Sequence, residues 1–506
     1  MKKRVTIALA LASVMAIAQQ DPPPRVTIEL PQGRAASIPA GPYAATWESI
    51  RANYTTPQWF VDGKFGIFIH WGVYSVPAAG SEWYPRHMYG GMLKYHTEKW
   101  GSPKVFGYKD FIPMFTAEHF RPDEWAALFK EAGATYVIPT AEHHDGFALY
   151  DSKLTRWDAK EMGPKRDLIG ALSKSVRAAG MKFGVSNHRM EHWDFMYPTQ
   201  ANEHDLFDPE YADFYGPPQK PDPSKSSAMG PTEEEVMEGK EAPQNQAFLE
   251  EWLARCQEII DTYQPDMLWF DNGINSRALD SIKLRLAAYY YNRAEEWGKD
   301  VSLSTKHDAY LYGTIRDFER QGRAPKEKTP YYWQVDEPIG HKFGYVEGLK
   351  LQTAGQVIRK LIDNISRNGN LCLNISPKAD GTIPEDQQLV LKEVGRWMRI
   401  NGEAVYGTHA WTFFGEGPRV NENPSAYDFR FTEKGTHTLY AFLMKWAGNE
   451  VVIKSFASDR LRTVQQVSLL GHAEALDFKQ TEDGLILSVP AENPNVDVSV
   501  FRIILE

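Results

Sequence analysis

Short, almost entirely apolar runs alternate with helical patterns through most of the chain. The run from Lys64 to His70 is apolar between its ends, which is typical of a strand buried on both faces. Runs of the same kind lie at 136–140, 182–186, 267–271 and 301–305. Helical patterns occupy 122–132, 168–179 and 248–263. The alternation predicts parallel strands joined by helical crossovers.

Polar residues gather just beyond the carboxyl ends of the predicted strands. In a (β/α)8 barrel this edge carries the active site. A doubly wound sheet would place polar residues in the same way, but no G-x-G-x-x-G turn follows any of these strands. We therefore predict an α/β fold with a (β/α)8-type barrel over residues 55–400.

A different pattern begins after Asn401. Apolar residues alternate with others at 429–431, 439–443, 485–489 and 496–500. Such period-two runs predict a C-terminal antiparallel β-sandwich over residues 401–506. Within the barrel, the stretch 198–246 is dense in Pro, Ser and acidic residues, and we expect it to form a long excursion over the barrel mouth.

The N-terminus has the pattern of a secretory signal peptide over residues 1–18. Positive charge at 2–4 precedes an apolar stretch, and Ala16 and Ala18 supply the small residues of a cleavage site. We expect cleavage near Ala18, a surface lead-in over residues 19–54, and a periplasmic or secreted mature protein. Cys256 and Cys372 lie far apart in apolar surroundings and are expected to be free thiols.

Composition narrows the classes of function. The 506 residues carry a formal charge of −10 with no long run of Lys or Arg, which argues against nucleic acid as a partner. No later segment is long and apolar enough to be a membrane anchor. Aromatic residues make up 13% of the chain, and rings with a polar tip suit the apolar faces of sugars.

Asp271 is the first candidate for a reactive group. It ends the apolar strand that contains Trp269, so a barrel would hold its carboxylate rigidly at the mouth, where it could attack the anomeric carbon of a sugar. The alternative is an Asp that caps the following loop through Asn272 and Gly273.

Histidines and carboxylates also follow two other strands. His143 and His144 stand between Glu142 and Asp145, and neither the H-E-x-x-H nor the C-x-x-C spacing of a zinc site is present. Hydrogen bonding to a polyhydroxyl ligand explains these residues better, and the pairs His70–Trp71 and Glu82–Trp83 repeat the combination of polar tip and flat ring. Each residue alone also fits a structural role, but together they indicate a sugar pocket.

Long motifs resemble the α-L-fucosidases of glycoside hydrolase family 29, over roughly residues 55 to 410. They are KFGIFIHWGVYSVP at 64–77, SEWY at 81–84, HHDGF at 143–147, GPKRD at 163–167, residues 265–271, and NLCLNISP at 370–377. The resemblance implies a barrel with a C-terminal β-sandwich and a retaining exo-glycosidase that needs no cofactor and no metal. It implies that Asp271 is the nucleophile and that Trp269 lies beside it. It also implies that fucose is held by His70, Glu82, Trp83, His143 and His144, with His188 as a weaker candidate.

The second carboxylate departs from the family pattern. Many members carry a Trp-Glu pair whose Glu is the general acid and base, but this chain has Trp333-Gln334, and an amide cannot donate a catalytic proton. We favour Glu319, because the run from Asp317 to Arg320 is expected to form an entrance loop on which Glu319 stands beside Arg320. Asp317 is the second choice, and Asp336 or Glu337 the third. The alternative for Glu319 is a surface ion pair with Arg316 or Arg320.

The sequence therefore predicts a retaining exo-α-L-fucosidase that acts on fucosylated oligosaccharides or glycoconjugates, with no nucleic-acid or membrane partner. A related α-L-galactosidase, a catalytically inactive carbohydrate-binding protein and a metal-dependent hydrolase are the alternatives. The linkage and aglycone preferences stay open, as does the oligomeric state, and a homo-oligomer is compatible with the chain.

Overall fold

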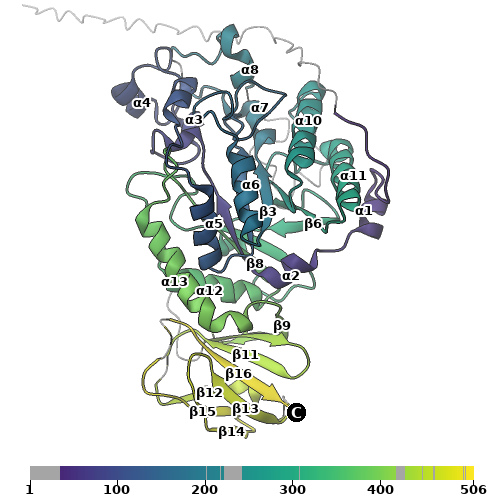
Figure 1. The fold of residues 1–506 in the computed structure, drawn as a ribbon, viewed down its shortest axis with the longest axis vertical. Coiled ribbons are helices and arrows are strands. Elements are labelled where there is room, and N and C mark those ends of the chain that lie inside the picture. The colour runs from purple at the N-terminus through teal and green to yellow at the C-terminus, as the bar shows by residue number, and fades with distance from the viewer. Residues whose placement is uncertain are drawn as a thin grey trace, which may run out of the picture.

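Eight parallel strands close into a barrel that forms the larger part of the molecule (Figure 1). The computed structural model describes residues 35–506 except 201, 217, 221–241, 307, 418–427, 447, 460–461, 494 and 496. The barrel strands are β1 (Phe65–Ile69), β2 (Tyr136–Glu142), β3 (Lys182–Asn187), β4 (Met267–Phe270), β5 (Ser302–Lys306), β6 (Thr314–Asp317), β7 (Trp333–Pro338) and β8 (Gly369–Ile375). β1 pairs with both β2 and β8, which closes the ring.

Alternation along the strands decides which side chains face the barrel interior. On β4, Phe270 packs outward against Trp252 of a covering helix, so Trp269 and Asp271 point inward. Trp269 meets Phe68 of β1 across the barrel, with ring centroids 4.9 Å apart. The interior is therefore filled by side chains, and only its carboxyl-end mouth is available for a ligand.

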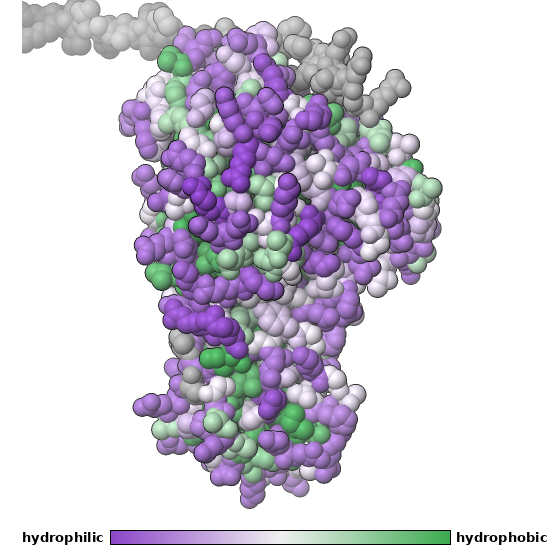
Figure 2. Space-filling view, in the orientation of Figure 1, coloured by the Kyte–Doolittle hydropathy of each residue, from purple (hydrophilic) through white to green (hydrophobic). Residues whose placement is uncertain are grey.

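The helices have the bounds α1 (Trp47–Asn53), α2 (Gln58–Gly63), α3 (Tyr84–His87), α4 (Leu93–Trp100), α5 (Pro122–Glu131), α6 (Leu168–Ala178), α7 (His192–Phe195), α8 (Ala212–Tyr215), α10 (Gln246–Tyr263), α11 (Asp280–Trp297), α12 (Ala354–Ile365) and α13 (Glu385–Asn401). Helices α5, α6, α10, α11, α12 and α13 surround the barrel, while α3, α4, α7 and α8 lie toward one end of it (Figure 1). Hydrophilic side chains cover most of the face in Figure 2. None of the helices in the described part of the chain is both long and apolar enough to cross a bilayer.

Two antiparallel sheets follow the barrel. One has the order β13-β16-β11-β10-β9 and the other the order β12-β15-β14. Side chains from both sheets, among them Phe431, Phe501, Ile453 and Leu485, form one hydrophobic cluster. The strands are β9 (His409–Glu416), β10 (Phe429–Lys434), β11 (Thr438–Leu443), β12 (Glu450–Ile453), β13 (Val464–Leu469), β14 (Phe478–Thr481), β15 (Gly484–Ser488) and β16 (Ser499–Leu505).

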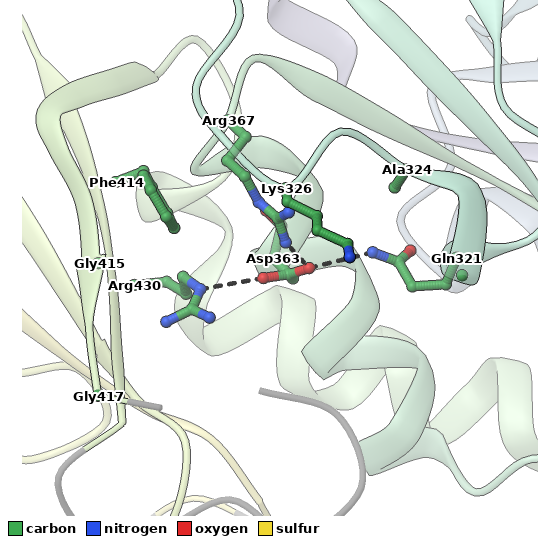
Figure 3. Close-up of a pocket in the computed structure, with 10 residues that line it drawn as sticks. Gln321, Ala324, Lys326, Asp363, Arg367, Phe414, Gly415, Gly417 and Arg430 are labelled. Carbon is green, nitrogen blue, oxygen red and sulfur yellow. Dashed lines mark hydrogen bonds and ion pairs between the residues drawn. The ribbon is translucent and has the colours of Figure 1, made fainter. Parts of the chain in front are cut away.

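A buried carboxylate ties the C-terminal sheets to the barrel. Asp363 on α12 accepts a hydrogen bond from Arg430 Nε of β10 at 3.0 Å and also pairs with Arg367 (Figure 3). Gln321, from the segment after β6, donates through Nε2 to the same carboxylate at 3.1 Å. These groups line a cavity of about 420 Å³ at the junction.

The predicted fold class is confirmed: a closed parallel barrel precedes antiparallel sheets. The five predicted barrel strands and three predicted helices are present, with ends shifted by at most two residues. The cysteines are free and buried, as expected. The predicted signal peptide, residues 19–34 of the lead-in, and residues 201, 217 and 221–241 of the stretch 198–246 lie outside the described residues.

One local expectation was wrong. Asp317 is not part of an entrance loop, because Thr314–Asp317 forms the barrel strand β6 and the Asp317 side chain is buried. The connection between the strands begins at Phe318 and carries Glu319. In the C-terminal region, the strand predicted from the last period-two run, 496–500, starts too early, because the observed strand β16 begins at Ser499.

Candidate active site

Asp271 lies at the centre of the barrel mouth, directly after β4. Its Oδ2 accepts a hydrogen bond from His188 Nδ1 at 2.9 Å, and its Oδ1 is 2.7 Å from the ammonium of Lys306 at the end of β5. Burial alone would raise the pKa of this carboxyl, but Lys306 and His188 outweigh burial and hold the pKa well below its usual range. Asp271 is therefore ionised, as a carboxylate nucleophile must be.

His188 is oriented as a hydrogen-bond donor to Asp271. Burial lowers the pKa of His188, so its ring is neutral and carries one proton. The carboxylate requires that proton on Nδ1, and Nε2 then accepts from the hydroxyl of Ser186, 2.9 Å away. Since both ring nitrogens have partners, His188 acts within the protein to position Asp271.

His144 and Glu191 form a second buried pair beside Asp271. Burial lowers the pKa of His144 to about 3, and its Nδ1 donates to the carbonyl of His188 at 3.1 Å. Its Nε2 is then an acceptor, 3.2 Å from a carboxyl oxygen of Glu191. Burial and then the charge of Asp271 raise the pKa of Glu191 well above its usual value, so Glu191 keeps its proton and donates it to His144.

His70 is oriented by Asn374 of β8. The Asn374 amide donates to the carbonyl of Phe343 at 2.8 Å, which directs its oxygen toward His70 Nδ1 at 2.7 Å. His70 therefore has its proton on Nδ1 and presents Nε2 as an acceptor. The ring of His143 lies 5.5 Å from that of His70, and its buried Nδ1 has no hydrogen-bond partner among the described residues.

Glu82 and Trp83 lie on the segment after β1. Glu82 is buried and its Oε2 accepts from the backbone N–H of Gly344 at 2.9 Å, which joins this segment to the one after β7. Burial raises the pKa of Glu82. Trp83 is partly exposed, and its ring packs edge-on against His144 with centroids 5.5 Å apart.

Trp269 lies one level below these groups. Its side chain has no exposed surface, and its Nε1 donates to Asp317 Oδ2 at 2.7 Å. The ring packs against His188, with centroids 5.1 Å apart, and lies 5.3 Å from the ammonium of Lys306. Trp269 thus forms the packed floor on which the groups around Asp271 rest.

Glu319 shares Lys306 with Asp271. Its Oε2 is 3.2 Å from the Lys306 ammonium and 3.3 Å from Arg323, and its Oε1 is 3.8 Å from Arg320. The side chain is 23% exposed, so it can be reached from the mouth. Arg316, an ion-pair partner considered from sequence, pairs with Asp308 instead. Because Lys306 contacts both carboxylates, Glu319 lies close to Asp271, the candidate nucleophile.

The other acidic candidates, Asp317, Asp336 and Glu337, have other partners within the protein. Asp317 accepts from Trp269 and, at 2.6 Å, from the amide of Gln334 inside the barrel. Asp336 is buried beside Asp317; burial and then that carboxylate raise its pKa well above the usual value. Glu337 faces away from the interior and pairs with Lys360 at 2.6 Å. Among these four carboxylates, Glu319 alone combines exposure to the mouth with a bridge to Asp271.

Within the described part of the chain, two groups of side chains have donor atoms close enough for a metal ion: His70 with His143 and His188, and His144 with His188 and Asp271. His188 belongs to both, yet its two nitrogens already bond to Asp271 and Ser186. A metal would have to displace one of these bonds. The donor sets are therefore better explained as a hydrogen-bonding network.

Sequence reasoning missed Lys306, Glu191 and the role of Asn374. Lys306 could have been found, because it is the first polar residue after the predicted strand 301–305, and such positions had identified Asp271 and His143. Glu191 and Asn374 carry no such signal. Glu191 lies four residues beyond β3, and Asn374 acts from within a strand.

Comparison with known proteins agrees with this geometry. A model of the α-L-fucosidase family matches residues 32–403, and a model of the α-L-fucosidase C-terminal domain matches residues 422–503. The chain belongs to the α-L-fucosidase family. Family membership makes it a glycoside hydrolase, and it agrees with the resemblance seen in the sequence motifs.

The relatives include proteins from animals and bacteria. Tissue α-L-fucosidase of Rattus norvegicus is 30% identical over 89% of both chains, and plasma α-L-fucosidase of Homo sapiens is 29% identical over 88% of both. The crystal structure of the α-fucosidase from Thermotoga maritima is 31% identical, with a TM-score of 0.72 that covers 91% of this chain and 100% of that one. The similarity therefore extends over the barrel and the C-terminal sheets together.

Proposed function

We propose that this α-L-fucosidase family member is a retaining exo-enzyme that releases terminal α-L-fucose from glycans. The proposal depends above all on the shared contact of Asp271 and Glu319 with Lys306, at 2.7 and 3.2 Å. Two carboxylates that touch one nitrogen are compatible with the separation of about 5 to 5.5 Å used by retaining glycosidases. An inverting enzyme needs a larger separation between its two carboxyl groups, because a water molecule must fit between one of them and the sugar.

In the first step, the ionised Asp271 attacks the anomeric carbon, and Glu319 gives a proton to the departing glycosidic oxygen. In the second step, Glu319 takes a proton from water, and that water attacks the anomeric carbon of the fucosyl ester and frees Asp271. Asp271 needs no proton removed beforehand because Lys306 and His188 keep it charged. Asp336 is a poorer acid candidate because it is only 1% exposed.

The fucose would occupy the mouth between the strand ends of β1, β2 and β4. His70 offers an acceptor nitrogen there, and the unpartnered Nδ1 of His143 offers a further polar contact. Glu82 adds an acceptor, and the ring of Trp83 offers an apolar face for the C6 methyl group, while both ring nitrogens of His144 already bond within the protein. The Thermotoga maritima enzyme has been crystallised with fucose and with a mechanism-based inhibitor, which supports this substrate for a relative of similar fold.

We also propose that the mature protein is secreted or periplasmic. The N-terminal sequence has the pattern of a signal peptide, and one of the relatives is a plasma enzyme. The substrate would then be an oligosaccharide or glycoconjugate outside the cytoplasm. The N-terminal sequence of the purified native protein tests this, with Gln19 expected as its first residue.

The activity is tested by hydrolysis of aryl α-L-fucosides, with azide as a substitute nucleophile. Asp271→Ala should lower kcat/KM by about 10³-fold or more and form β-fucosyl azide, because azide then attacks the substrate directly. Glu319→Ala should form α-fucosyl azide through the covalent intermediate. Formation of the same azide anomer by both variants would contradict these two roles.

The remaining alternatives give different outcomes in the same assay. Binding of fucose without turnover of any fucoside by the intact protein would favour the carbohydrate-binding protein. Faster hydrolysis of aryl α-L-galactosides than of fucosides would favour the related glycosidase, since a pocket for a methyl group excludes an added hydroxyl only weakly. Loss of activity with a chelator, and its return with metal, would favour the metal-dependent hydrolase.

A further inference from the structure

The turn that carries Glu319 has a backbone conformation that its sequence does not favour. Arg320, the next residue, has φ 62° and ψ 144°, a region that residues other than glycine rarely adopt. Such a conformation is strained and persists only where neighbouring contacts hold it. The side chain of Glu319 depends on this turn, because it determines how the strand end of β6 leads into the next segment.

Hydrogen bonds hold the turn on both sides of Arg320. Before and at this residue, the backbone N–H groups of Phe318 and Arg320 donate to carbonyls of β7 at 2.9 and 3.0 Å. After it, Gln321 donates its backbone N–H to Glu337 at 2.7 Å. The Gln321 amide group donates further to Asn364 at 2.7 Å and to Asp363 at 3.1 Å, both on α12.

The last of these anchors reaches the C-terminal sheets. Asp363 accepts from Gln321 and from Arg430 of β10, and these three side chains converge at the domain junction (Figure 3). Asp363 is 3% exposed and Arg430 is 5% exposed, so the pair is almost wholly buried at the wall of the junction cavity and holds a defined geometry. Arg430 is thus separated from Glu319 by only two side chains and a short stretch of backbone.

We propose that Gln321, Asp363 and Arg430 position Glu319, so that the C-terminal sheets set the geometry of general acid catalysis from outside the barrel. This inference rests on the proposed role of Glu319. The three residues are positioning residues and do not touch the substrate. Without the anchor, the strained turn at Arg320 relaxes and Glu319 moves away from the glycosidic oxygen, while Asp271 stays in place on β4.

A leaving-group series separates this role from a merely structural one. The values of kcat/KM are measured for phenyl, 4-nitrophenyl and 2,4-dinitrophenyl α-L-fucosides, because an activated phenol departs without a proton and a poor one does not. Gln321→Ala should lower kcat/KM about 30-fold for the phenyl fucoside and less than about 3-fold for the dinitrophenyl fucoside. Arg430→Gln should show the same pattern with a smaller amplitude.

Two further variants complete the experiment. Asp497→Asn breaks another ion pair between the barrel and the C-terminal sheets, with Arg359 at 2.6 Å, that does not involve the Glu319 turn; it should leave the leaving-group dependence unchanged. In a Glu319→Ala background, Gln321→Ala should have no additional effect on the phenyl fucoside.

The outcomes distinguish the inference from the function on which it rests. Equal loss on all three substrates for Gln321→Ala, no loss on any of them, or the same pattern for Asp497→Asn would overturn the positioning role. If Glu319→Ala itself showed no dependence on the leaving group and no azide product, the assignment of Glu319 as acid would fail first.

Discussion

The two halves of the barrel mouth are built in different ways. The half formed by β1 to β4 carries His70, His143, His144 and His188, whose side chains are buried and whose pKa values burial lowers, so all four rings are neutral. The other half carries charges: Lys306, Glu319 and the arginines that follow, with Arg323 61% exposed. Asp271 lies where the halves meet.

This difference separates two tasks. Neutral imidazoles can select hydroxyl groups through directed hydrogen bonds without attracting ions; His70 presents its acceptor nitrogen to the mouth, while His144 and His188 use both ring nitrogens within the protein. Charged groups near solvent suit the half of the mouth where the general acid gives a proton to the leaving group and later takes one from water. The first half is held by packing within the barrel, and the second is held from outside, through Gln321 and the C-terminal sheets.

The largest effect is expected where the halves meet. Lys306→Met should lower kcat/KM by about 10²- to 10³-fold, because the nucleophile loses its counter-ion and Glu319 loses its bridge. Lys306 helps to keep the pKa of Asp271 low, so its removal raises that pKa, and the acid limb of the pH profile of kcat/KM should move to higher pH. An unmoved acid limb would contradict this assignment.

Lys283→Met is a matched control for Lys306→Met. Lys283 is also fully buried and pairs with Asp280 at 2.9 Å, but it has no contact with Asp271 or Glu319. Thermal unfolding of both variants measures the shared cost of losing a buried pair. The control should keep the wild-type acid limb.

A smaller effect is expected within the neutral half. Asn374→Ala should lower kcat/KM about 10- to 50-fold, because His70 loses the acceptor that fixes its tautomer and can turn its acceptor nitrogen away. The loss should be similar for phenyl and dinitrophenyl fucosides, since proton donation is unaffected. Asn370→Ala removes another buried amide from β8 and should leave the kinetics near wild type; equal losses in the two variants would indicate damage to the strand alone.

The protonated state of Glu191 predicts a contrast between two substitutions. Glu191→Gln should change kcat/KM by less than about 3-fold, because an amide N–H can replace the carboxyl proton that His144 accepts, while Glu191→Ala should cost about 10-fold. The comparison is made at the pH optimum with the 4-nitrophenyl fucoside. A loss in Glu191→Gln as large as in Glu191→Ala would mean that Glu191 works as a carboxylate.

The smallest effect is expected at the rim of the charged half. Arg323→Gln should change kcat/KM by no more than about 3-fold, because an ion pair this exposed is worth little and is screened by salt. Raising the ionic strength should remove whatever difference remains. A large and salt-resistant loss would show that Arg323 belongs to the buried machinery.

The same division explains what could be predicted from the sequence. The strands of the neutral half are nearly continuous apolar runs, and each was found. Strands β6, β7 and β8 were not recognised, because polar side chains interrupt their apolar runs: Gln334 donates to Asp317 and accepts from Tyr136, and Asn370 donates to the carbonyl of Phe60. Buried polar side chains of this kind interrupt the apolar run from which a buried strand is predicted.

The site shows the same limit. The motifs identified the residues that follow strands, including Asp271, but the bridge from Lys306 to Glu319 joins residues on different strands. The anchor of Glu319 is further removed, since Asp363 and Arg430 are distant in sequence from Glu319 and from each other. Such contacts depend on how the sheets dock onto α12, and no local pattern encodes that arrangement.

The position of the last strand has a consequence for the order of events during synthesis. β16 (Ser499–Leu505) pairs with β11 on one side and with β13 on the other, so a strand that comes late in the sequence lies inside its sheet. Until those residues leave the ribosome, β11 and β13 have no shared neighbour. A nascent chain can therefore close its barrel, whose last strand ends at Ile375, more than a hundred residues before it can complete the sheet that contains Arg430.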